Sequence, residues 1–133
     1  MNIRQIDHVT INVTDMEKTR EFYGKLLGLR ELDCVDKGDH ELTFFELPGG
    51  AKLELVVYRY ETADNGQTAT DRGRARHLAF EVDDVYALEK KLTEAGYPFH
   101  VPVSYVDKLG FSGGLTRDPN GFELEFLEYP RHS

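Results

Sequence analysis

Four residues of this sequence have the side chains that a metal ion requires: His8, Glu54, His77 and Glu125. Imidazole nitrogens and carboxylate oxygens together are typical ligands of divalent transition metals. A single strand histidine or glutamate is ordinarily solvated or hydrogen-bonded, so none of the four predicts a metal site by itself. Their spacing predicts such a site, because one histidine and one glutamate recur as a pair at matching positions in both halves of the chain.

An internal repeat creates this match. The stretch "HVTINVTDM" (8–16) aligns with "HLAFEVDDV" (77–85), and "PGGAKLELVVY" (48–58) aligns with "PNGFELEFLEY" (119–129), at nearly the same offset. Agreement at both ends of the unit, in the same order, indicates two copies of one module. Each copy therefore offers one histidine and one glutamate, and two copies would leave two positions of an octahedral metal open for water or substrate.

Each copy is predicted to fold as a strand, a helix and three further strands. The helices are expected at 15–27 and 84–95, where apolar residues recur with helical spacing, and Gly28 and Gly96 end them. Alternating apolar residues and turn signals predict strands at 5–13, 29–35, 41–47, 51–58, 76–82, 98–103, 110–117 and 122–129. This order predicts an α+β fold of two tandem βαβββ modules.

Strand parity predicts where the four side chains point, because successive residues of a strand face opposite sides of the sheet. Val9, Ile11 and Val13 form one face of the first strand, so His8 belongs to the other. Glu54 likewise alternates with the leucines of its strand. If both sheets curve away from their helices, the two histidines and two glutamates line a common concavity.

Composition limits the classes of partner. The formal net charge of −8 argues against a nucleic-acid or anionic-membrane surface. No apolar run approaches the length of about 20 residues that spans a bilayer, and the N-terminus lacks a secretory pattern. The single cysteine, Cys34, excludes an intrachain disulfide and fits a cytoplasmic location. We expect a small-molecule substrate.

The sequence resembles the vicinal oxygen chelate superfamily, the glyoxalase/bleomycin resistance/dioxygenase fold. The resemblance rests on "HVTINVTDMEKTREFYGKLLGL", "LELVVY", "RHLAFEVDD" and "DPNGFELEFLE" and covers nearly all of the chain. It implies one domain over 1–133, with module one about 1–58, a linker at 59–76 and module two about 77–129. It also implies a cupped, barrel-like mixed sheet with helices outside, around one divalent metal (Ni, Zn, Co, Fe or Mn). The family's ligand positions fall on His8, Glu54, His77 and Glu125.

This ligand set is most similar to that of glyoxalase I. The resemblance implies a lyase or isomerase that transfers a proton through a metal-stabilised enediolate of a substrate with two vicinal oxygens. Glu125 is the first candidate for the base and Glu54 the second. Bacterial glyoxalase I, however, has an arginine four residues after its first ligand and an asparagine four residues after its second, where this chain has Asn12 and Tyr58. The usual contacts to glutathione are therefore missing.

Three alternatives stay open. A metal-dependent acyl-CoA epimerase would use loop cations, for which the candidates are Arg59, Arg72, Arg74, Arg76 and Lys108. A small dioxygenase would use the same fold with a different ligand set. A non-catalytic antibiotic-binding resistance protein would use an aromatic groove, for which the candidates are Phe44, Phe45, Tyr105, Phe111 and Tyr129.

The remaining acidic and histidine residues have no counterpart in the repeat. Glu123 and Glu128 align with Lys52 and Val57, so both glutamates are expected to be solvated. The sequence assigns no role to His40, His100 or His132. The length of the connecting loop suggests that it is functional. We expect a homodimer, with each metal site built either within one chain or across two.

Overall fold

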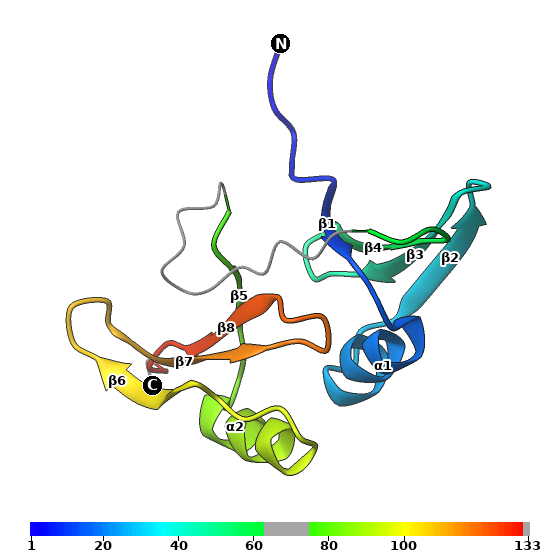
Figure 1. Ribbon diagram of the computed structural model, residues 1–133. Helices are drawn as coiled ribbons and strands as arrows, with labels where there is room; N and C mark the ends of the chain where they lie inside the picture. Colours follow the sequence, from blue (N-terminus) through cyan, green and yellow to red (C-terminus); the bar gives the residue numbers. More distant parts are fainter. Residues whose placement is uncertain (63–74, 132–133) are drawn as a thin grey trace. The chain divides into compact units, whose positions relative to one another are not determined.

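The computed structural model describes residues 1–62 and 75–131 of the chain. The chain divides into two compact units, 1–65 and 66–133, and Figure 1 shows one sheet in each. We call the described parts of these units module one and module two. Both have the order strand, helix, three strands, so the predicted α+β fold of two βαβββ modules is confirmed.

Module one contains a four-stranded mixed sheet in the order β1-β4-β3-β2. Its strands are β1 (His8–Asn12), β2 (Glu31–Asp36), β3 (His40–Glu46) and β4 (Lys52–Tyr58). β1 runs parallel to β4, whereas the other neighbours are antiparallel. The chain crosses from β1 through a helix before it builds the meander, and the meander's last strand returns beside β1. The strand that carries His8 therefore neighbours the strand that carries Glu54.

The predicted first helix has two parts. It begins as α1 (Met16–Arg20), which Asp15 caps by accepting a hydrogen bond from the Lys18 backbone N–H at 3.1 Å. It continues as a π-helical segment, η1 (Glu21–Leu26), in which the Leu27 N–H bonds to the Phe22 carbonyl. The wider turn allows the adjacent Phe22 and Tyr23 both to be fully buried. Helical periodicity located this segment but cannot distinguish the two helix types.

Module two repeats the same topology in the order β5-β8-β7-β6. Its elements are β5 (Leu78–Glu81), α2 (Val85–Glu94), β6 (Val101–Val106), β7 (Phe111–Arg117) and β8 (Glu123–Glu128). The parallel pair has the register of module one: Val9 faces Leu53, and Leu78 faces Leu124. The repeat seen in the sequence is thus a repeat of strand pairing.

The strand predicted at 98–103 was wrong in its bounds, because β6 begins at Val101. Pro98 has no N–H to donate to a ladder. Its carbonyl instead accepts a hydrogen bond from the Thr116 hydroxyl at 2.9 Å. A register irregularity between Val101 and Ser104 follows, and it contains Pro102. The segment before β6 is therefore held to β7 by a side chain, outside the strand ladder.

Each module has its own core on the face predicted from strand parity. In module one the fully buried side chains include Leu53 and Leu55 of β4, and in module two Leu124 and Phe126 of β8 match them. Leu92 of α2 is also fully buried, and α2 contacts β6 and β8. Within the described part of the chain, no helix has the length and hydropathy of a membrane span.

Candidate metal centre

In module one the structure brings His8 and Glu54 together. The His8 Nε2 atom lies 3.8 Å from a Glu54 carboxylate oxygen. The other imidazole nitrogen, Nδ1, lies 2.7 Å from the carboxylate of Asp7. The hydroxyl of Thr10, which faces Glu54 across the parallel strand pair, donates a hydrogen bond to Glu54 at 3.3 Å. This module therefore presents one nitrogen and one carboxylate group that face each other.

Module two makes the same pair from His77 and Glu125. The His77 Nε2 atom lies 3.5 Å from the Glu125 carboxylate. His77 Nδ1 lies 3.2 Å from the carboxylate of Glu123. Ala79 stands where module one has Thr10, facing Glu125 across the strand pair, and it has no hydroxyl to donate. Glu125 therefore lacks the hydroxyl contact that holds Glu54.

The two pairs have the donor chemistry of a transition-metal site. A neutral imidazole has one N–H and one lone pair, so an Nδ1–H donated to a carboxylate leaves the Nε2 lone pair free for a metal. In both modules a carboxylate meets Nδ1, and Nε2 faces the predicted glutamate ligand. The hydrogen bond to His8 lowers the pKa of the Asp7 carboxyl, with a smaller contribution from Lys52. These residues fit a divalent metal.

Glu123 is not solvated, contrary to the sequence-based expectation. Its side chain is only 6% exposed. One carboxylate oxygen lies 3.2 Å from His77 Nδ1 and 3.6 Å from the Arg76 guanidinium. The other oxygen lies 3.2 Å from His100 Nε2. Glu123 has the strand parity of Glu125, so it shares the face of the predicted ligand, and the repeat alignment missed it because module one has Lys52 there.

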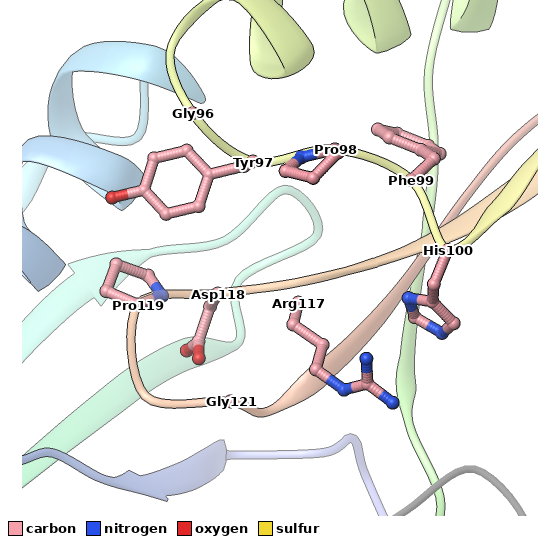
Figure 2. Close-up of a pocket in the computed structure, with 9 residues that line it drawn as sticks. All are labelled: Gly96, Tyr97, Pro98, Phe99, His100, Arg117, Asp118, Pro119 and Gly121. Atoms are coloured by element: carbon pink, nitrogen blue, oxygen red, sulfur yellow. The ribbon is translucent and has the colours of Figure 1, made fainter.

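His100 also has a structural place that the sequence did not predict. It precedes β6 and lines a recess of about 540 Å³ whose other residues include Tyr97, Phe99, Arg117 and Pro119. Figure 2 shows its imidazole on the side of the recess where the Arg117 side chain lies. His100 therefore connects the lining of the recess to Glu123, which in turn contacts His77.

Glu128 is likewise not merely solvated. Its carboxylate accepts a hydrogen bond from the backbone N–H of Val85 at 2.8 Å. Val85 is the first residue of α2, whose N-cap is Asp84. Glu128 therefore satisfies a helix N-terminal donor that has no partner within the helix, and it joins α2 to β8.

Some candidates of the alternative functions have structural partners. Arg59 forms ion pairs with Asp36 at 2.7 Å and Glu41 at 3.0 Å. The hydrogen bond to Arg59 lowers the pKa of Asp36 and raises that of Arg59. Phe45 and Phe111 lie in the cores of their modules. Arg72, Arg74, His132 and residues 63–74 of the predicted functional loop lie outside the described residues.

The two positions at which the glutathione contacts of bacterial glyoxalase I were expected to be missing are both in module one. Asn12 ends β1 and is exposed. Tyr58 ends β4, and its ring lies 5.5 Å from the ring of His40 and 5.3 Å from that of Tyr60, between centroids. Both Tyr58 and Tyr60 are exposed. An exposed aromatic group therefore stands where bacterial glyoxalase I has a polar amide.

The structure describes the modules separately, and each supplies half of the predicted ligand set. Within either one, no three described His, Cys, Asp or Glu side chains are arranged to hold a metal ion. A site that combines His8 and Glu54 with His77 and Glu125 therefore stays a prediction. It needs both halves, from one chain or from two.

Comparison with known proteins gives one consistent family. Residues 5–126 match the model of the Glyoxalase/Bleomycin resistance protein/Dioxygenase superfamily. A probable lactoylglutathione lyase of Vibrio parahaemolyticus is 28% identical over 96% of this chain and 93% of its own length. A lactoylglutathione lyase of Haemophilus influenzae is 26% identical over 93% and 92%. The crystal structure of a glyoxalase/dioxygenase from Nostoc punctiforme superposes with a TM-score of 0.81 at 27% identity, covering 98% of this chain and 94% of that one. The chain belongs to the glyoxalase/bleomycin resistance protein/dioxygenase superfamily.

Proposed function

We propose that this protein is a metal-dependent lyase or isomerase of the glyoxalase I type. It transfers a proton between adjacent carbons of a small substrate that carries two vicinal oxygens. The relatives named lactoylglutathione lyase support this class of reaction. The observation that carries the proposal is the arrangement found in both modules, in which a carboxylate meets Nδ1 and leaves Nε2 facing a glutamate.

His8, Glu54, His77 and Glu125 would hold the metal. When bound, the metal would supply Lewis-acid stabilisation of negative charge on the substrate oxygens. Two histidines and two carboxylates leave room for those oxygens in an octahedral shell. The four side chains also orient the substrate, since its oxygens must meet the positions that the protein ligands leave free.

Glu125 is the better candidate for the catalytic base. Glu54 accepts a hydrogen bond from Thr10, which fixes one of its oxygens. Glu125 faces Ala79 instead, so no hydroxyl at that position restrains it. A base that takes a proton from carbon in one step and returns it in the next needs this freedom to reorient. Glu125 would remove the proton from one substrate carbon and deliver it to the neighbouring one.

We further propose that the substrate is not the glutathione hemithioacetal. Asn12 and Tyr58 replace the arginine and asparagine that hold glutathione in bacterial glyoxalase I. The exposed rings of Tyr58 and Tyr60 favour an apolar or planar group at this end of β4. Assays should compare hemithioacetals, hydroxy-ketones and acyl-CoA esters for solvent proton exchange at the carbon next to the carbonyl. Exchange that is fastest with the glutathione hemithioacetal would contradict this choice.

The metal is tested independently of the substrate. The protein purified under native conditions should contain Ni, Co, Fe, Mn or Zn, measured by elemental analysis. Glu125→Gln should lower that content, because an amide is a weaker ligand than a carboxylate. Glu94→Gln, on an exposed position of α2, is the control and should retain the metal. Absence of metal from the wild type after incubation with each ion would refute the proposal.

We propose a homodimer, in line with the cupped sheets expected from the family. Sedimentation should give twice the chain mass. Mixing His8→Ala with His77→Ala chains then locates the site. If each site combines module one of one chain with module two of the other, a mixed dimer has one intact site and regains activity. If each chain closes its own site, no activity returns.

A further inference from the structure

Glu123 is a buried carboxylate in an unusual position. It lies on β8 two residues before the predicted ligand Glu125, on the same face, and is 6% exposed. A buried carboxylate is costly unless charge partners or hydrogen bonds compensate it. Both of its oxygens have such partners, His77 and Arg76 on one side and His100 on the other. The surroundings of Glu123 are thus built to hold a negative charge beside His77.

Module one meets the same need with an unrelated residue. The carboxylate on His8 Nδ1 comes from Asp7, the preceding residue in the chain. The carboxylate on His77 Nδ1 comes from Glu123, on the neighbouring strand. At the position of Glu123 module one has Lys52, and at the position of Asp7 module two has Arg76. Descent from one repeat cannot explain contacts made by non-equivalent residues, whereas a shared requirement at Nδ1 explains both.

His100 completes the arrangement in module two. The segment before β6 is tied to β7 because Thr116 donates to the carbonyls of Tyr97 and Pro98, at 3.3 and 2.9 Å. This places His100 Nε2 3.2 Å from the second oxygen of Glu123. An Nε2–H donated by His100 fixes the rotation of that carboxylate. The first oxygen then stays aimed at His77.

We infer that Glu123 is a positioning residue, held by His100, that keeps the proton of His77 on Nδ1 and so presents the Nε2 lone pair to a metal. The inference rests on the proposed metal site, but the tautomer of His77 exists without metal. Carboxylate partners of this kind typically change metal affinity by about 10–100-fold. Neither Glu123 nor His100 touches the substrate in this scheme.

The first test uses metal-free full-length protein. Imidazole ¹⁵N chemical shifts should show His77 as the Nδ1–H tautomer in the wild type. In Glu123→Leu the shifts should move toward the Nε2–H tautomer that a free histidine side chain prefers in water. Glu123→Gln, whose amide carbonyl can still accept from Nδ1, should remain close to the wild type. The shifts of His8 should not change in either variant.

The second test measures metal binding by calorimetry and the visible spectrum of the Co²⁺ form. Glu123→Leu should bind Co²⁺ about 10–100-fold more weakly, and Glu123→Gln should recover most of the loss. Glu128→Leu is the matched control, because it removes a carboxylate of the same strand that caps α2. It should lower the melting temperature without altering the His77 tautomer or the Co²⁺ spectrum.

The outcomes separate this inference from the proposed function. A His77 tautomer and a Co²⁺ affinity that are the same in Glu123→Leu as in the wild type would overturn the role of Glu123 and leave the metal site intact. A tautomer that shifts in a protein that binds no metal would support the positioning of His77 and overturn the proposed function. Circular dichroism checks that Glu123→Leu is folded. If Glu123→Leu does not fold, the tautomer and Co²⁺ affinity of Glu123→Gln are compared with those of the wild type instead.

Discussion

The two modules have the same sheet and the same strand register, yet the surroundings of their histidines differ. In module one the carboxylate on Nδ1 is Asp7, which is 71% exposed, and His8 is 42% exposed. In module two it is the buried Glu123, and His77 is 23% exposed. The repeat has kept the two facing atoms, the imidazole Nε2 and the glutamate oxygen, while the supporting carboxylate has come from different places. Module two therefore has the more buried histidine and supporting carboxylate, whereas the facing glutamate is the more exposed one there, Glu125 at 23% against Glu54 at 15%.

The largest difference between the modules is expected from their glutamates. Glu125→Gln should reduce kcat by about 10²–10⁴-fold per bound metal, because it removes the proposed base. Glu54→Gln should mainly weaken metal binding and leave kcat per bound metal within about tenfold. Steady-state kinetics on fully metallated protein, with metal content measured in parallel, compares the two. If both variants lost the same factor in kcat per bound metal, Glu125 would not be distinguished from Glu54 as the catalytic base.

A glycine in module two tests how closely β6 must approach β7. A Cβ atom on Gly114 would lie 2.7 Å from the Val101 carbonyl oxygen and 3.0 Å from the Val103 nitrogen. Gly114 faces Phe126 across the strands, as Thr43 faces Leu55 in module one. Gly114→Ala should therefore destabilise the protein by about 2–3 kcal/mol, since backbone must move.

Chemical denaturation measures this change, with Ser112→Ala of the same strand as the control. The control should change stability by less than about 0.5 kcal/mol. The Glu123–His100 contact should also be disturbed in Gly114→Ala, because His100 precedes the displaced strand. If Gly114→Ala had wild-type stability, module two would tolerate a side chain at this position, as module one does with Thr43.

Asp7 sharpens the comparison of the histidines. Asp7→Leu should weaken Co²⁺ binding less than Glu123→Leu, within about tenfold, because water can replace an exposed carboxylate at His8 Nδ1. Calorimetry on both variants under the same buffer gives the ratio. A larger effect from Asp7 than from Glu123 would mean that burial does not decide which histidine is held more firmly.

The smallest effect concerns the ion pair between Arg59 and Asp36 of module one. The pKa of Asp36 is lowered in the folded protein by the hydrogen bond to Arg59. A lowered pKa means that the pair stabilises the fold above the unfolded value of 3.8 and loses this contribution as the pH falls through the folded pKa. The melting temperature of Asp36→Asn should lie slightly below that of the wild type at neutral pH, and the difference should vanish in acid. A difference that grows in acid would contradict the assignment.

Much of the fold was predictable from local pattern. Apolar alternation located β4 and β8 within one residue at each end, and helical spacing located α2. The error at β6 came from Pro98, which has no N–H to donate to a ladder, and the ladder begins only at Val101. The π-helical turn at Glu21–Leu26 was also missed, because Phe22 and Tyr23 satisfy either helix geometry until their burial is known.

The residues of the candidate site that have a counterpart in the internal repeat were predictable from the sequence. His8, Glu54, His77 and Glu125 stand out because each has a counterpart at the matching strand position, and the structure pairs them two by two. Glu123 and Glu128 were misjudged for the opposite reason. They have no counterpart, so alignment of the two halves treated them as solvated, and the same lack of a counterpart left His100 without a role.

The sequence by itself determined the two-module α+β fold, the family and the two His–Glu pairs, because strand parity and repetition are local properties of the chain. Only the tertiary structure decided which carboxylate supports each histidine. The sheet order β5-β8-β7-β6 places β8 beside β5, and the segment before β6 is tied to β7, so Glu123 meets both His77 and His100. These residues lie far apart in sequence, and pairing across a sheet, not periodicity along it, makes them neighbours.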